Sequence, residues 1–197
     1  MQGAMDAETI TIHEVVGEEQ TGRVLGYIQP IYQKNYGTSP ETIWQNCLIA
    51  ENGDGIVGVM AMGFSKRGKE AQEVLDHFLF GSETLVHPLE SFVALGRWVA
   101  ARREAGRALM FAAVKLALAR GRTHSISCSK PNVCEYVREH YHLRFQSHNL
   151  LINRSTIAPA DRPYFLTDPP PQLCIGELKQ WHAELEQQIP PMFEIEV

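Results

Sequence analysis

The sequence predicts one α/β domain, residues 1–197, in which helices flank a mixed, mostly antiparallel central sheet. From residue 9 to about residue 152, the apolar positions change between the period of a strand and that of a helix, in an order that places helices on the faces of a sheet. The chain has 197 residues, 44% of them apolar and 21% charged, which suits one globular domain. The sequence shows no internal repeat.

The first two predicted elements are a strand and a long helix. Residues 9–16 alternate and are rich in β-branched side chains, which is typical of a strand. Residues 18–36 have apolar side chains at helical spacing, Val24 and Ile28 among them. Pro30 lies inside this helix, so we expect it to kink or divide the helix.

A β-hairpin is predicted next. Residues 43–50 and 56–64 are both rich in strand-forming side chains, and the sequence Glu-Asn-Gly-Asp-Gly of residues 51–55 supplies the positive-φ positions that a hairpin turn needs. Residues 65–90 are polar at first and then apolar, which predicts a connection with some helix and a hydrophobic anchor.

The second half begins with a strand-loop-helix unit. Residues 91–99 are predicted to form a strand, residues 100–104 a loop and residues 106–120 a helix rich in Ala and Leu. A short strand over residues 124–129 follows.

The last predicted core elements are a helix and a strand. They cover residues 132–141, with Pro131 and Asn132 as the cap, and residues 145–152. The core is therefore expected to span about residues 9–152. Residues 153–197, which contain three consecutive prolines and a helical pattern at residues 176–188, are expected to be a C-terminal extension that wraps the domain.

Composition excludes several classes of protein. The apolar stretches are shorter than the roughly 18 to 20 residues of a membrane helix, and the N-terminus has no signal-peptide pattern, so we expect a cytoplasmic protein. A pI of about 5.9 disfavours nucleic acid as a partner. The four cysteines lack a Cys-x-x-Cys pair, so we predict buried thiols and neither a disulfide nor a metal site. They are Cys47, Cys128, Cys134 and Cys174.

The net charge of −5 is unevenly distributed. Residues 97–130 contain a single acidic residue, Glu104, and a larger set of basic residues: Arg97, Arg102, Arg103, Arg107, Lys115, Arg120, Arg122 and Lys130. This basic segment suits a phosphate ligand or an acidic protein partner, although a solvated helix face would also account for it.

The junction between the strand over residues 91–99 and the following helix carries the pattern Arg103-x-x-Gly106-x-Ala108. Small residues let backbone N–H groups approach a diphosphate, and the positive end of the helix dipole adds to the attraction. Arg102 and Arg107 add charge. Because many helices begin with Gly and Arg, an ordinary helix start is the alternative.

This pattern resembles the acyl-donor loop of the GNAT acyltransferases, between their fourth strand and third helix. The resemblance covers residues 9 to about 152. It implies that the fourth and fifth strands, residues 92–99 and 124–129 here, part around the pantetheine arm of a thioester donor. It places the donor phosphate at Ala101, Arg102, Arg103, Gly106, Arg107 and Ala108. It also implies that a backbone N–H near Trp98 or Val99 polarises the thioester carbonyl.

A narrower resemblance rests on Gly96-Arg97-Trp98-Val99, which looks like a segment of the acyl-homoserine-lactone synthases. The chain is also similar in length and layout to long-chain N-acyl amino acid synthases such as the N-acyltyrosine synthases, which take the acyl group from acyl carrier protein. The lactone synthases usually carry Glu where this chain has Ala94, so the resemblance favours the amino acid synthases.

The resemblance implies transfer of a long fatty acyl group from the phosphopantetheine of acyl carrier protein, with acyl-CoA as the alternative donor and no tightly bound cofactor. The acceptor is expected to be the α-amine of an amino acid, in particular an aromatic one such as tyrosine. Alternatives are a lactone-type autoinducer synthase, an acyl-CoA-dependent acetyltransferase and a non-catalytic acyl-carrier or effector-binding module.

Apolar and aromatic side chains near the predicted cleft are candidates for substrate binding, with plain core packing as the alternative. Candidates for the fatty chain are Leu79, Phe80, Phe92, Leu95 and Trp98. Candidates for the acceptor side are Tyr32, Tyr36 and Trp44. Arg97 offers a planar fork for the acceptor carboxylate, or for a neighbouring carboxylate within the fold.

Attack of an amine on a thioester requires a base for the ammonium group and a proton for the leaving thiolate. Glu90 and His87 precede the fourth strand and are candidate bases, with a surface position as the alternative. Tyr141 is the candidate acid by resemblance, and His140 competes with it because the segment is out of register by about one residue.

Overall fold

A computed structural model of the chain describes residues 9–44, 46–189 and 193–197. Its strands are β1 (Ile10–Val16), β2 (Asn46–Asn52), β3 (Gly55–Gly63), β4 (Phe92–Ala100), β5 (His124–Ser129), β6 (Gln146–His148), β7 (Gln172–Glu177) and β8 (Phe193–Glu196). Its α-helices are α1 (Glu18–Tyr36), α2 (Lys69–Asp76), α3 (Arg103–Ala119), α4 (Pro131–Tyr141), α5 (Arg162–Leu166) and α6 (Leu178–Glu186). Short 3-10 turns lie at Gly81–Thr84, Leu89–Ser91 and Pro159–Asp161.

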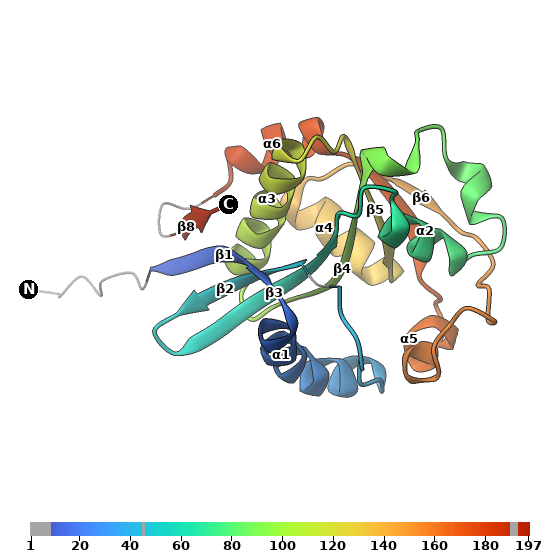
Figure 1. The fold of residues 1–197 in the computed structure, drawn as a ribbon, viewed down its shortest axis with the longest axis horizontal. Helices are drawn as coiled ribbons and strands as arrows, with labels where there is room; N and C mark the ends of the chain where they lie inside the picture. The colour runs from blue at the N-terminus through green and yellow to red at the C-terminus, as the bar shows by residue number, and fades with distance from the viewer. Residues whose placement is uncertain (1–8, 45, 190–192) are drawn as a thin grey trace, which may run out of the picture.

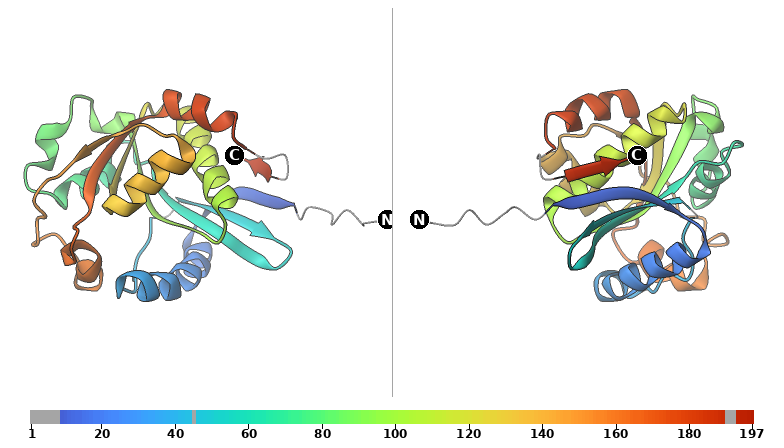
Figure 2. Two further views of the ribbon diagram at one scale, coloured as in Figure 1. Left: turned by 180° about the vertical axis from the view of Figure 1, so that it is seen from behind. Right: turned by 60° about the vertical axis from the view of Figure 1, so that its left-hand side comes forward.

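The strands form one sheet in the order β6-β7-β5-β4-β3-β2-β1-β8. Neighbouring strands are antiparallel except for β4 with β5 and β1 with β8, which are parallel. Figure 2 shows β8 beside β1 at one edge of the sheet. The prediction of a mixed, mostly antiparallel sheet flanked by helices is confirmed.

Helices cover both faces of the sheet (Figure 1). On one face, α3 and α6 pack in a cluster that includes Val93 and Leu95 of β4, and Val137 and Tyr141 of α4 belong to the same cluster. On the other face, α1 packs on β1, β2 and β3, and α2 packs on β4 and β5. The central parallel pair, β4 and β5, therefore lies where three hydrophobic clusters meet.

Local sequence patterns account for the hairpin and the first helix. Gly55 adopts a φ of 121°, and the Asn52 side chain accepts a hydrogen bond from the backbone N–H of Asp54, so the expected turn joins β2 and β3. The prediction that Pro30 divides the first helix is wrong, because α1 is continuous. Pro30 is exposed, while Val24 and Ile28 anchor the opposite side of the helix in the core.

Several element boundaries differ from the prediction, and two of the differences bear on the site and the sheet. Helix α3 begins at Arg103, three residues before the expected start, so the donor-loop pattern lies in its first turns. Strand β6 has only three residues, because its partner β7 pairs with Gln146 to His148 alone. The N-cap of α4 also differs from the prediction. It is Lys130, and no side chain makes a capping hydrogen bond there.

The expected C-terminal extension is instead part of the sheet. Strand β7 lies between β5 and β6, and β8 pairs with β1. The predicted helical pattern at residues 176–188 is confirmed in part as α6, but its first two residues belong to β7. The boundary of the core at about residue 152 is therefore wrong, because residues 172–177 form a strand inside the sheet, between β5 and β6.

Within the described residues, every helix is too short or too polar to span a membrane.

Candidate active site

Strands β4 and β5 part near the middle of β4. Their parallel pairing runs from Phe92 opposite His124 to Leu95 opposite Ser127 and then ends, although β4 continues to Ala100. Beyond Leu95, the edge of β4 that faces β5 has no strand partner among the described residues. Such an edge offers backbone N–H and C=O groups to a ligand.

A β-bulge in β4 lies at the same place. Val59 of β3 pairs with Val99 and Ala61 pairs with Gly96, so Arg97 and Trp98 together lie opposite one residue of β3. Arg97 has a φ of 48°, in the left-handed region. A bulge reverses the alternation of side chains. Leu95 and Trp98 consequently both face the α3 side of the sheet, although they are three residues apart.

A groove of about 430 Å³, here called the α3–α4 groove, lies beside the end of β4. Its walls are Trp98, Ala100, Ala101, Arg102, Arg103, Asn132, Val133, Tyr136 and Tyr141. The first turns of both α3 and α4 line it, and neither helix has a side-chain cap. Two helix N-termini and two arginines thus direct positive charge and N–H groups into one groove, which suits a phosphate.

The donor-loop residues divide into two groups. Trp98, Ala101, Arg102 and Arg103 line the α3–α4 groove. The remaining ones, Val99, Gly106, Arg107 and Ala108, do not line it. Val99 packs on the α1 side of the sheet, and Ala108 is fully buried in the α3 core.

Arg107 and Gly106 serve the packing of α3 instead. The Arg107 guanidinium donates hydrogen bonds to the carbonyl oxygens of Gln188, at 3.2 Å, and His140, at 3.0 Å. A Cβ on Gly106 would lie 2.5 Å from the Tyr141 hydroxyl oxygen. Gly106, in the first turns of α3, therefore allows α3 and α4 to approach each other closely at Tyr141.

Tyr141 lies in the wall of the α3–α4 groove, where its hydroxyl donates to the backbone carbonyl of Arg103 at 3.0 Å. Burial raises the pKa of Tyr141, and the Arg107 guanidinium lies 5.5 Å from the centre of its ring. The side chain thus holds the first turn of α3 in position. Tyr136, which sequence analysis missed, lines the same groove.

A small apolar cavity of about 60 Å³, here called the central cavity, lies where β4 and β5 part. Its walls include Leu95, Trp98, Met110, Ser127, Val133, Phe145 and Trp181. Trp98 also lines the α3–α4 groove, and the indole Nε1 of Trp98 is buried without a hydrogen-bond partner among the described residues.

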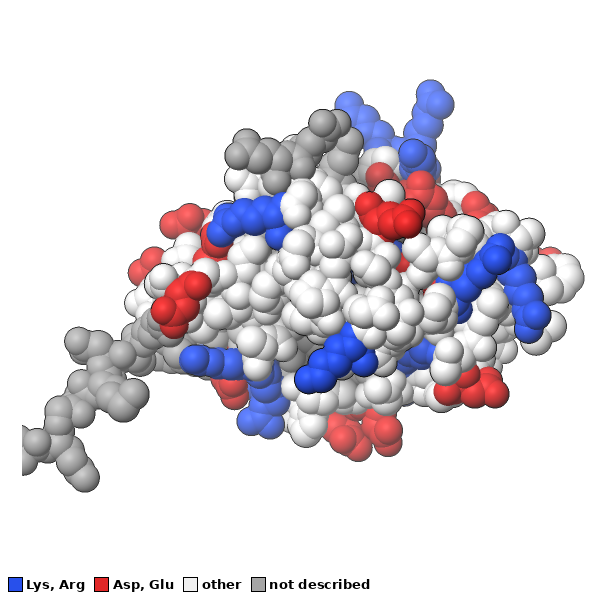
Figure 3. Space-filling view, turned by 90° about the horizontal axis from the view of Figure 1, so that it is seen from below, with Lys and Arg blue, Asp and Glu red and all other residues white. Residues whose placement is uncertain are grey.

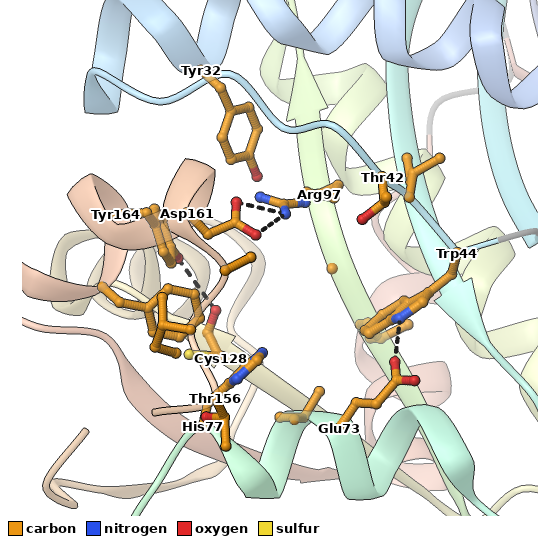
Figure 4. Close-up of a pocket in the computed structure, with 17 residues that line it drawn as sticks. Tyr32, Thr42, Trp44, Glu73, His77, Arg97, Cys128, Thr156, Asp161 and Tyr164 are labelled. Carbon is orange, nitrogen blue, oxygen red and sulfur yellow. Dashed lines mark hydrogen bonds and ion pairs between the residues drawn. The ribbon is translucent and has the colours of Figure 1, made fainter. Parts of the chain in front are cut away.

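A third hollow, of about 440 Å³, lies on the opposite face of the sheet and is here called the α1–α5 pocket (Figure 4). It is lined by Tyr32 of α1, by Trp44, by Glu73 and His77 in and after α2, by Leu95, Gly96 and Arg97 of β4, by Cys128 of β5, and by Ile157, Asp161, Tyr164 and Phe165. Its volume is that of a small-molecule site. Leu95 lines both this pocket and the central cavity.

An ion pair stands in the wall of the α1–α5 pocket. Nη2 of Arg97 lies 2.8 Å and 2.9 Å from the two carboxylate oxygens of Asp161 (Figure 4). The Arg97 guanidinium also lies 5.4 Å from the centre of the Tyr32 ring. Burial raises the pKa of Tyr32 to about 12, so this hydroxyl keeps its proton at neutral pH.

The α2 side of the pocket carries further polar groups. The Trp44 indole donates to Glu73 at 3.2 Å. Burial lowers the pKa of His77, and burial raises the pKa of the Cys128 thiol. Cys128 is therefore a protonated thiol, which is a poor nucleophile.

The predicted substrate-binding residues are only partly brought together. Tyr32, Trp44, Leu95 and Arg97 line the α1–α5 pocket. Tyr36 lies behind the wall, with its ring 5.3 Å from that of Tyr32 and 5.1 Å from that of Tyr164.

The structure does not bring Leu79, Phe80 and Phe92 together in one pocket. Leu79 and Phe80 are exposed on the connection after α2, and Phe92 is buried in the core under that helix.

The predicted bases Glu90 and His87 also lie away from this site. His87 stacks on His124, with ring centres 4.0 Å apart, in a separate pocket at the start of β4. Glu90 is exposed just before that strand. Phe92 at the start of β4 and Arg97 at the bulge are separated by about 16 Å of extended chain. Closeness in sequence to the strand does not place these side chains near its bulge.

The basic segment of residues 97–130 does not form one continuous surface. Arg122 donates to the carbonyl oxygens of Glu90, Phe64 and Ser65. The Lys130 ammonium donates to those of Thr167 and Pro169. Arg120 pairs with Glu14, and the fold also engages Arg97 and Arg107. Arg102, Arg103 and Lys115 remain exposed. On the face that carries α1 and α5, basic and acidic side chains are interspersed (Figure 3).

Sequence analysis missed the wall of the α1–α5 pocket that residues 156–165 contribute. Asp161, Tyr164 and Phe165 come from this segment. The Tyr164 hydroxyl donates to the carbonyl of Cys128 at 3.2 Å, and this bond ties the segment to β5. No periodic pattern marks these residues, so only the long-range contacts reveal them.

The fold that positions the parting of β4 and β5 is shared with solved structures. BjaI, a CoA-dependent acyl-homoserine lactone synthase, aligns over 95% of this chain and 93% of its own, with a TM-score of 0.64 and 14% identity. The acyl-homoserine lactone synthase LasI aligns over 93% and 98%, with a TM-score of 0.59 and 10% identity. The fold is that of the acyl-homoserine lactone synthases.

The acyl-homoserine lactone synthase fold is also similar to that of N-acetyltransferases. A protein from Lactobacillus plantarum described as an N-acetyltransferase covers 86% of this chain, with 99% of its own chain aligned, a TM-score of 0.53 and 14% identity. No protein-family model matches the chain, and no curated protein matches it in sequence. At these identities, the likeness establishes the fold, and the chemistry has to be argued from the site.

Proposed function

We propose that the chain is an N-acyltransferase that moves a long-chain acyl group from a phosphopantetheine thioester to the α-amine of an amino acid. One observation carries this proposal: the three hollows follow one another across the parting of β4 and β5. Trp98 lines the α3–α4 groove and the central cavity, and Leu95 lines the central cavity and the α1–α5 pocket. A donor held in the groove would present its thioester to an acceptor in the pocket.

The α3–α4 groove supports a donor that carries phosphate. Two uncapped helix N-termini and the exposed Arg102 and Arg103 supply its positive potential. Acyl carrier protein is the proposed donor, because an acidic partner would complement these two arginines at the mouth of the groove. Free acyl-CoA carries the same pantetheine arm and is the alternative donor.

The central cavity supports an apolar acyl chain at the thioester end. Its walls are formed mainly by Leu95, Met110, Val133, Phe145 and Trp181. A volume of about 60 Å³ equals roughly two water molecules in the liquid. A long chain would therefore have to part these side chains as it enters.

The α1–α5 pocket supports an amino acid as acceptor. Arg97 and Asp161 place a positive and a negative group side by side in its wall, which complements the carboxylate and ammonium groups of a zwitterion. Tyr32, Trp44 and Tyr164 provide aromatic walls that suit an aromatic side chain such as that of tyrosine.

The reaction needs no side-chain nucleophile. The neutral amine attacks the thioester carbon, the C–N bond forms and the C–S bond breaks, and the thiolate takes a proton as it leaves. In this proposal a backbone N–H on β4 near Trp98 polarises the carbonyl, which is supported by the end of the pairing between β4 and β5 at Leu95. Burial keeps the Cys128 thiol protonated by raising its pKa, which disfavours an acyl-cysteine intermediate.

A lactone-type autoinducer synthase is the second candidate. The structure of BjaI contains SAM and isopentyl-CoA, and its fold covers nearly the whole of this chain. In the α1–α5 pocket, the carboxylates of Glu73 and Asp161 outnumber the single Arg97, which suits an acceptor with an extra positive charge. Against this, Ala94 stands where the lactone synthases usually carry Glu.

Product analysis by mass spectrometry separates the candidates. The purified protein is incubated with long-chain acyl carrier protein or acyl-CoA, together with a mixture of amino acids or with SAM. N-acyl amino acids, with tyrosine preferred, would support the proposal. Acyl lactones from SAM would support the second candidate, and acetylated amines from acetyl-CoA a simple acetyltransferase. Donor binding without any product would indicate a non-catalytic binding module.

A further inference from the structure

The proposed reaction lacks a base at the places that sequence analysis indicated. At neutral pH, the acceptor amine is largely an ammonium ion, which has to lose a proton before it attacks. Glu90 and His87 lie beyond the far end of β4 from the bulge. A base for the acceptor has to come from the walls of the α1–α5 pocket.

Most ionisable groups in that pocket are already engaged or hold their protons. Asp161 is paired with Arg97, and Glu73 accepts from Trp44 and lies 3.7 Å from the Lys69 ammonium. Burial raises the pKa values of Tyr32, Tyr164 and Cys128, so these three groups are protonated at neutral pH. Each of these five groups is therefore either engaged by a partner or protonated.

His77 differs from all of them. It follows the last turn of α2, and its ring packs against Phe165 with the ring centres 4.7 Å apart. Its Nδ1 is buried and has no hydrogen-bond partner among the described residues. Figure 4 shows the ring directed into the pocket from the side opposite Tyr32. A buried ring nitrogen without a partner is uncommon and calls for a ligand.

Burial keeps the imidazole of His77 neutral, and the charges around it change this only in part. Burial lowers its pKa, and Arg97 on β4 lowers it further. Asp161 from the segment before α5, and Asp76 and Glu73 on α2, oppose this effect only in part. A neutral imidazole at pH 7 has a lone pair on one ring nitrogen, as a proton acceptor requires.

We propose that His77 is the general base of the acyl transfer and takes one proton from the ammonium group of the acceptor. The proposal rests on the proposed function of the α1–α5 pocket. The amine nitrogen gives its first proton to the His77 imidazole and its electron pair to the thioester carbon. After attack, the second proton leaves the nitrogen and the thiolate takes a proton, so the thiol is released. The imidazolium then returns its proton to solvent.

The test compares His77→Gln with His87→Gln, which makes the same change at a histidine outside the site. Product formation by the wild-type protein is measured first, and then kcat/KM for the acceptor between about pH 6 and pH 9. We expect His77→Gln to lower kcat/KM about 100-fold near pH 7, because glutamine cannot accept the proton. The deficit should narrow as the pH approaches the pKa of the amine. His87→Gln should match the wild type.

A second variant separates catalysis from folding. Imidazole added to His77→Ala should restore part of the activity, while thermal unfolding and donor binding stay close to those of the wild type. Wild-type activity in His77→Gln, with an unchanged pH profile, would overturn the base while leaving acyl transfer intact. A loss that is equal at every pH and that imidazole does not restore would also overturn it. A wild-type protein that acylates no amine would overturn the proposed function and the base together.

Discussion

The hydroxyl of Tyr141, the last residue of α4, donates a 3.0 Å hydrogen bond to the backbone carbonyl of Arg103, the first residue of α3. The two helices whose N-termini line the α3–α4 groove are thereby joined by one side chain. The position of the α3 N-terminus in the groove thus depends on the packing between α3 and α4.

Tyr141→Phe should loosen this join without removing a catalytic acid. The loss of one buried hydrogen bond is expected to lower the free energy of unfolding by about 0.5 to 1.5 kcal/mol. The Michaelis constant for the donor should rise, because the first turn of α3 is held less firmly, while the turnover number changes little. Steady-state kinetics and thermal unfolding check both effects. If the turnover number instead falls about 100-fold or more at an unchanged donor constant, Tyr141 is the acid.

Gly106→Ala should destabilise the fold, because its Cβ would lie 2.5 Å from the Tyr141 hydroxyl oxygen and 3.1 Å from Cζ2 of Trp98. Overpacking of this kind costs about 1 to 3 kcal/mol. Adding Tyr141→Phe removes the nearest atom, so the double variant should lose less than the sum of the two single losses. Gly26→Ala is the matched control, since a Cβ there meets nothing within 4 Å. A melting temperature of Gly106→Ala equal to that of Gly26→Ala would contradict the close approach.

Replacing Arg102 and Arg103 together by Glu should weaken donors that carry phosphate. We expect kcat/KM for an acyl-phosphopantetheine to fall about tenfold or more, since each charge-assisted contact contributes about 1.5 to 3 kcal/mol. An acyl-pantetheine without phosphate should be affected much less. Lys115→Glu, which changes an exposed charge elsewhere on α3, is the control. Equal losses for both donors would place the phosphate outside this groove.

Arg97→Ala should raise the Michaelis constant for the amino acid about tenfold or more, with little change in that for the donor. Because the change also leaves Asp161 unpaired, the double variant Arg97→Ala with Asp161→Ala is needed. The double variant should recover stability but not acceptor affinity. If it recovers both, or if the wild type acylates amino acid amides as well as free amino acids, the ion pair serves only the fold.

Much of the fold can be predicted because its patterns are local. The period of α3, the Gly-containing turn between β2 and β3, and the order of elements up to β5 are all visible in short windows of sequence. Strand β7 escapes such a prediction, because it follows three prolines and its partner β5 lies far back in the chain. Pairing over such a distance leaves no mark on the local pattern.

The candidate site divides in the same way. Arg102 and Arg103 can be found from sequence, since the pattern that positions them spans one strand-to-helix junction. Asp161 is held at the pocket by long-range contacts of its segment, such as the bond from Tyr164 to β5 and the ion pair with Arg97, which no local signal indicates. The sequence favours His87 over His77, because His87 lies nearer to β4 along the chain. In the fold, His77 lines the α1–α5 pocket and His87 lies in a separate one, so distance along the chain is a poor guide to position around the bulge.

The place of β7 governs when the nascent chain can close its sheet on the ribosome. Once residues 1–171 have emerged, β5 still has one bare edge, and β6 has no strand beside it at all. Bare edges of this kind recruit strands from other molecules. We therefore expect an aggregation-prone stage of synthesis before β7 emerges, from which chaperones that cover such edges would protect the chain.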